Sequence, residues 1–137
     1  MGAWGAGVLE DDTALDFIEE QLIPQADPRV VMREAFEAAM SADYVDYEMG
    51  HAVLVSAAAI RAALFGEALE EDEQEEWTEW RNGLSSLDFS QLKPLAAQAC
   101  LRVCADQSEL CELWSENEDL FPDWKAGVTS LATSVGS

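Results

Sequence analysis

The sequence is poor in basic residues and has a single histidine. Seven lysines and arginines stand against 28 aspartates and glutamates in 137 residues, which gives a formal net charge of −21. A surface this negative repels phosphate backbones and anionic lipid headgroups. We therefore expect no direct nucleic-acid binding and no docking on an anionic membrane. With one histidine, the chain also offers few nitrogen ligands for a transition metal.

The sequence also lacks the patterns of export, membrane insertion and a disulfide framework. No basic segment followed by a long apolar run opens it. Its most apolar window, Met49–Phe65, is shorter than the usual ~20-residue span and contains polar residues. Cys100, Cys104 and Cys111 are odd in number and form no Cys-x-x-Cys pair, so we interpret them as small core residues. We expect a cytoplasmic protein in which Met49–Phe65 belongs to a buried helix.

Apolar residues are nevertheless abundant enough to form a core, at 49% of the chain. The length suits one domain over residues 1–137. Apolar residues recur at spacings of three and four, and clear β alternation is missing. We predict an all-α fold, a single-domain bundle of about six helices. An extended segment rich in glycine and tryptophan would precede it, and Ala42–Asp46 is a weak strand candidate.

Several residues predict where helices begin. Asp27-Pro28 is typical of a start, because aspartate caps free N–H groups and proline at the first position loses none. Ser90 or Asp88 would cap a helix over residues 91–105. Asp106 and Glu109 have the spacing of a capping box. The inward faces would include Val31, Ala35, Ala38 and Ala39 after Pro28, then Leu110, Leu113 and Trp114, and finally Trp124, Val128 and Leu131.

The densest charge lies between Glu67 and Glu79, where eight carboxylates occur without a base. As a helix, this run would carry about one charge per 2.4 Å, against about one per 1.7 Å in duplex DNA. Trp77 and Trp80 share a helical face that would hold the run on the core. We predict that its carboxylates bind a partner: Glu70, Glu71, Asp72, Glu73, Glu75, Glu76 and Glu79.

This pattern favours a non-enzymatic inhibitor or immunity-type factor that presents carboxylates to a basic protein. The partner would be a nuclease, a toxin or a DNA-binding protein, and the acidic face would mimic DNA. We expect no catalytic residues, metal or cofactor, and the acidic segments lack the glycine of a calcium loop. One alternative is a metal-dependent or hydrolytic enzyme centred on His51, with Asp46 and Glu48. A further alternative is a structural or oligomerising module. The acidity itself could also be explained by salt adaptation, without any partner.

Two end motifs carry a family resemblance. The opening runs Met1-Gly2-Ala3-Trp4-Gly5, and Ser108-Glu109-Leu110-Cys111-Glu112-Leu113-Trp114 lies near the other end, before a late tryptophan, Trp124. The chain resembles the bacterial domain-of-unknown-function 4259 family of small acidic proteins. The resemblance implies a single small helical domain with no assigned chemistry.

Overall fold

The computed structural model describes residues 12–65 and 75–136. These residues form an all-α body of seven helices, and no strand occurs among them. The helices are α1 (Asp12–Phe17), α2 (Pro28–Ser41), α3 (Tyr47–Phe65), α4 (Glu75–Leu84), α5 (Lys93–Val103), α6 (Glu109–Ser115) and α7 (Phe121–Gly136), and a π-helical turn, η2 (Ile18–Leu22), continues α1. The predicted all-α fold is therefore confirmed. The predicted extended N-terminal segment lies outside the described residues.

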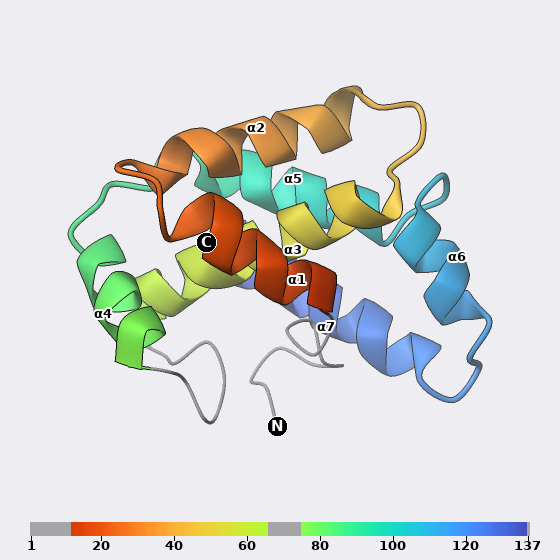
Figure 1. Ribbon diagram of the computed structural model, residues 1–137. Helices are drawn as coiled ribbons and strands as arrows, with labels where there is room; N and C mark the ends of the chain where they lie inside the picture. The colour runs from red at the N-terminus through yellow and green to blue at the C-terminus, as the bar shows by residue number, and fades with distance from the viewer. Residues whose placement is uncertain (1–11, 66–74, 137) are drawn as a thin grey trace.

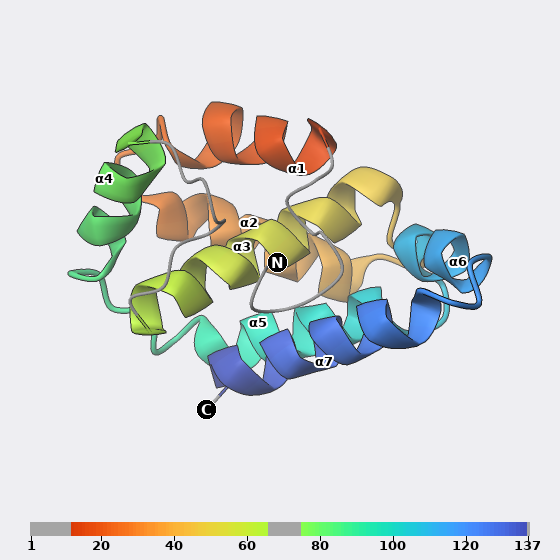
Figure 2. The ribbon, with the colours of Figure 1, turned by 90° about the horizontal axis from the view of Figure 1, so that it is seen from below.

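Helix α3 runs through the middle of the body. Figure 2 shows it between α1 on one side and α5 with α7 on the other, while α2 crosses above it in Figure 1. Four of its alanines, Ala57, Ala58, Ala59 and Ala62, are buried, as are Val53, Leu54 and Ile60. By length and composition alone α3 could cross a membrane. The core helix of a helical bundle passes the same test, and most of α3 is buried against its neighbours.

Helices α5 and α7 form the most extensive helix pair. Trp124, Val128 and Leu131 of α7 are buried, as predicted, in the same core as Ala96 and Cys100 of α5. At the start of α7, the ring of Trp124 stacks on that of Trp114 from α6, with centroids 5.8 Å apart. This aromatic pair attaches α6 to the end of the bundle opposite α4 (Figure 1).

Hydrogen bonds join the α2–α3 connection to the α5–α6 connection. We call this contact, formed by Ala42, Asp43 and Val45 on one side and Asp106, Gln107 and Glu109 on the other, together with Arg102, the clasp. Val45 donates its N–H to the carbonyl of Gln107 at 2.9 Å and accepts the N–H of Glu109 at 2.8 Å. Arg102 donates to two carbonyls on each side, at distances between 2.8 and 3.2 Å. The strand predicted at Ala42–Asp46 is thus wrong. Only a single bridge, between Val45 and Ser108, forms there, because the chain enters α3 at Tyr47 and α6 at Glu109, directly after the bridged residues.

Two predicted helix caps are also wrong. Ser108, not Asp106, caps α6, and its Oγ accepts the N–H of Cys111 at 3.4 Å. The helix starts late because Gln107 is left-handed, with φ 64°, so regular helix begins only beyond it. Helix α5 has no side-chain cap, and Leu92 occupies the N-cap position. The carboxylate of Asp88 instead accepts the N–H of Ser90 in a local turn.

Two predicted faces are rotated from their expected orientation. Helix α2 buries Met32, Phe36 and Ala39, whereas Ala38 is exposed. The larger side chains of Met32 and Phe36 determine which side of α2 faces the core, because their burial removes more apolar surface from water than the burial of an alanine does. On α6, Leu110 is buried but Leu113 is 45% exposed, because the short helix contacts the body along one side only.

Candidate functional site

An open groove of about 460 Å³ separates α1 and η2 from the first turns of α3. Its apolar floor is formed by Phe17, Met49 and Ala52, all partly buried. Its rim carries three exposed carboxylates, from Asp16, Glu20 and Glu48. No lysine or arginine is among the described residues that line it. We call this feature the α1–α3 groove.

The helix along one side of this groove is irregular. The N–H of Ile23 bonds the carbonyl of Ile18 at 2.9 Å, five residues back, which makes η2 a π-helical turn. Such turns are rare and often occur at functional sites, because they change the direction of the side chains that follow. Here Ile18 and Leu22 remain buried while Glu20 and Gln21 line the groove. The turn therefore anchors the segment and leaves its polar residues at the opening.

The acidic run predicted as a partner-binding face is described only in part. Glu70, Glu71, Asp72 and Glu73 lie outside the described residues, as does the side chain of Glu76. Glu75 and Glu79 are exposed on α4, which starts at Glu75. Trp80 is partly buried and packs against the core. The role of the run as a binding face therefore stays a prediction.

The three residues of the enzymatic alternative have different surroundings. The Oδ1 atom of Asp46 accepts the N–H of Met49 at 2.9 Å and so caps α3. Glu48 lies at the α1–α3 groove. His51 is 6% exposed, and its ring meets that of Tyr47 edge-on, with centroids 4.5 Å apart. Asp46 thus has a structural task, and His51 belongs to the core.

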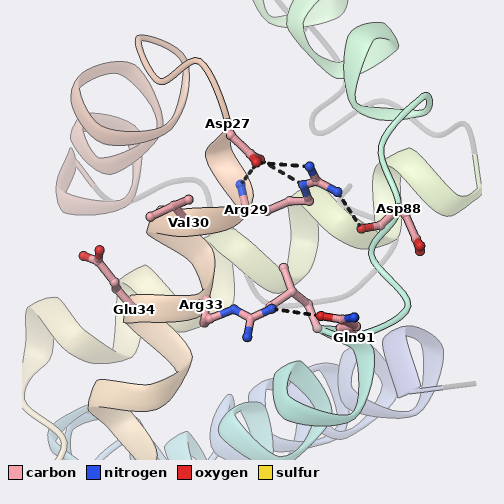
Figure 3. Close-up of a pocket in the computed structure, with 8 residues that line it drawn as sticks. Asp27, Arg29, Val30, Arg33, Glu34, Asp88 and Gln91 are labelled. Carbon is pink, nitrogen blue, oxygen red and sulfur yellow. Dashed lines mark hydrogen bonds and ion pairs between the residues drawn. The ribbon is translucent and has the colours of Figure 1, made fainter.

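A second cleft, of about 400 Å³, lies where α2 meets the α4–α5 connection (Figure 3). Arg29 donates to both carboxylate oxygens of Asp27, at 2.9 and 3.0 Å, and to the carbonyl of Asp88 at 3.1 Å. The side-chain hydrogen bond from Arg29 lowers the pKa of Asp27. Arg33 reaches Gln91 at 3.5 Å. Because Arg29 and Arg33 of α2 bond to Asp88 and Gln91 across the junction, we interpret the cleft as a structural contact that holds α2 against the α4–α5 connection.

The cysteines follow the predicted pattern in part. Cys100 and Cys104 are buried, whereas Cys111 is only partly buried. All three are free thiols. Within residues 12–65 and 75–136, no group of three or more histidine, cysteine, aspartate or glutamate side chains is arranged to hold a metal ion.

The comparison with family models decides the relationship of this chain. The model described as domain of unknown function DUF4259 matches residues 2–127. The chain belongs to the DUF4259 family. The resemblance noted at both ends of the sequence is thereby confirmed, and the match extends across the acidic run between them. No curated protein and no solved structure matches the chain significantly. The membership brings no assigned activity with it.

The α1–α3 groove was not predicted from the sequence. Asp16 and Glu20 are four residues apart, a spacing that indicates a shared helical face. That signal was available but weaker than the run of eight carboxylates further along. Glu48 could not have been added, because only the packing of α1 on α3 brings it to the same opening.

Proposed function

We propose that this protein acts by binding a basic protein partner, as an inhibitor or immunity-type factor, and that the α1–α3 groove is a contact surface. The observation that carries the proposal is the composition of the groove. Three exposed carboxylates surround an apolar floor, and none of the described residues that line the groove is a lysine or arginine. Such a surface suits a partner segment that presents lysine or arginine beside an apolar side chain.

The protein's own cations are largely engaged elsewhere, which supports this reading. Arg102 binds backbone carbonyls in the clasp. Lys125 lies 6.0 Å from the ring centroid of Phe121, and Arg29 is paired with Asp27. Even complete pairing of the seven bases would leave 21 of the 28 carboxylates uncompensated (28 − 7). A cationic partner would therefore be attracted from a distance and would associate rapidly at low salt.

The test is affinity capture with charge-matched variants. The groove variant is Asp16→Asn with Glu20→Gln and Glu48→Gln. The control variant, Glu34→Gln with Glu37→Gln and Glu116→Gln, removes the same charge from exposed positions outside the groove. Because exposed ion pairs contribute about 0.2–1 kcal/mol each, we expect the groove variant to bind the captured partner roughly tenfold more weakly. The control should stay within about threefold of the wild type, the loss expected from weakened long-range attraction alone.

The outcomes separate a specific contact from general acidity. The proposal is supported if the wild type and the control both retain a partner that high salt releases, and the groove variant does not retain it. Equal losses in both variants would refute the groove as the contact. A third variant, Glu75→Gln with Glu79→Gln, tests the predicted acidic run in the same assay. Selective loss there would move the contact to α4.

A further inference from the structure

A third cleft, of about 670 Å³, opens between the end of α5, the α5–α6 connection and the start of α7. Two cysteines, Cys104 and Cys111, line it together with Lys125. Asp106 and Glu112 supply carboxylates at its edge. The third cysteine, Cys100, is completely buried and is not among the lining residues. The fold therefore places two cysteines at an open cleft and the third in the closed core.

The two lining cysteines are neighbours in space. The Sγ atom of Cys111 lies 3.7 Å from the carbonyl oxygen of Cys104. The Sγ atom of Cys104 in turn lies 3.5 Å from the carbonyl of Leu101. A disulfide requires that the Cα atoms of its cysteines come within about 4.4–6.8 Å. Since the Cys111 thiol contacts the backbone of Cys104 across a connection of only six residues, these two cysteines are the pair in which to look for a disulfide.

The surroundings of the thiols set how readily they react. Burial raises the pKa of both Cys104 and Cys111. At Cys104 a hydrogen bond with the side chain of Thr129 and the charge of Lys125 oppose this rise, and at Cys111 the charge of Lys125 opposes it. Asp106 and Glu112 add to the rise at Cys111. Burial raises the pKa of Cys100 as well, and no cation opposes it there. Since the thiolate is the nucleophile, the two cleft thiols should react slowly near neutrality and faster as the pH rises, whereas Cys100 stays inert.

We propose that Cys104 and Cys111 form an oxidation site at which a small uncharged peroxide joins them in a disulfide. The thiolate of Cys111, the more exposed of the two, attacks one peroxide oxygen. The O–O bond breaks, hydroxide leaves and becomes water with the released proton, and Cys111 carries a sulfenic acid. The Cys104 thiolate attacks the sulfenic sulfur, an S–S bond forms and a second water leaves. Two thiols and one peroxide thus give one disulfide and two waters.

The charge of the protein favours an uncharged oxidant. At a net charge of −21, anionic disulfides such as oxidised glutathione are repelled, whereas hydrogen peroxide approaches freely. The product would close a ring around residues 105–110, which include Gln107 and Glu109 of the clasp. Oxidation would therefore fix the connection that attaches α6 to the start of α3.

The experiment treats the full chain with hydrogen peroxide, blocks the remaining thiols with an alkylating agent, and maps the peptides by mass spectrometry. We expect the three free thiols to fall to one, with Cys104 linked to Cys111 within one chain and Cys100 alkylated after denaturation. Dithiothreitol should restore all three. The Cys100→Ser variant is the matched control and should form the link at the wild-type rate.

Other products would overturn the proposal. Separate sulfinic acids on Cys104 and Cys111, a link between two chains, or a bond from Cys104 to Cys100 would each contradict it. Should Cys104→Ser fail to fold, the less buried Cys111→Ser variant still decides. In the Cys111→Ser variant, we expect peroxide to leave Cys104 without a disulfide bond. A disulfide between Cys104 and Cys100 in this variant would contradict the proposal. This readout needs no partner, so it stands or falls separately from the proposed function.

Discussion

Glu109 of α6 accepts the backbone N–H of Tyr47, the first residue of α3, at 3.0 Å across 62 residues of sequence. The start of the central helix is therefore capped twice. Asp46 supplies one carboxylate from the adjacent chain, and Glu109 supplies another from a distant helix. Negative charge is favourable at this position because the N-terminus of a helix carries partial positive charge. Two of the many carboxylates thus have a structural task that is unrelated to any partner.

Replacing Glu109 with alanine should lower the free energy of unfolding by about 1 kcal/mol, since a helix cap and a hydrogen bond to a charged group are lost together. Glu109→Gln should lose less, because its amide oxygen still accepts the Tyr47 N–H. Urea unfolding followed by circular dichroism measures both. The exposed Glu118→Ala variant makes the same charge change and should have little effect. Equal losses at both positions would show that charge alone matters.

Gly50 and Gly83 should respond to alanine with opposite signs. A Cβ atom at Gly50 would lie 2.6 Å from Cδ1 and 3.1 Å from Cγ of Leu110, which is itself buried. Overpacking of this kind costs about 1–3 kcal/mol and separates α6 from α3. At Gly83, within α4, a Cβ would meet nothing within 4 Å, so alanine should stabilise by about 0.5–1 kcal/mol through helix propensity. Thermal and urea unfolding of both variants check the pair. A stabilised Gly50→Ala would refute the described approach of α6.

Tyr44 should ionise at unusually high pH. Its hydroxyl donates to Oε2 of Glu112 at 2.5 Å, and this hydrogen bond to a negative carboxylate raises the pKa of Tyr44 from 10.0 to about 12. Spectrophotometric titration of the two tyrosines should therefore show one late transition. Glu112→Gln should return the pKa of Tyr44 towards 10.0. Tyr44→Phe should remove the late transition. Ionisation of Tyr44 near its ordinary pKa in the wild type would contradict the hydrogen bond.

The same shift predicts a direction for stability. The folded chain holds the Tyr44 proton more tightly than the unfolded chain, so the contribution is fully present below pH 10.0 and is lost as the pH rises to about 12. Urea unfolding across that window should show a steeper decline for the wild type than for Tyr44→Phe. Parallel declines would mean that the hydroxyl makes no such contribution.

Features that depend on neighbouring residues were predictable from the sequence. Asp27-Pro28 does begin a helix: the carboxylate accepts the N–H of Arg29 at 3.1 Å and Pro28 takes the first position. The Met49–Phe65 window belongs to a buried helix because its residues are apolar on several sides. The cap of α6 was predicted wrongly: Asp106 was expected, and Ser108 supplies it. The left-handed conformation of Gln107 delays the start of the regular helix until after that residue, so Ser108 takes the N-cap position.

The sequence alone was enough to identify a highly acidic all-α protein of the DUF4259 family, because helix periodicity, charge and the two end motifs are properties of short segments. It did not determine which carboxylates share an opening or which thiols share a cleft. The α1–α3 groove joins residues 16 and 48, and the clasp joins residues 45 and 107. Only the packing of α1, α5 and α6 around α3 makes these contacts, since they depend on side-chain volumes and on bonds between segments far apart in the chain.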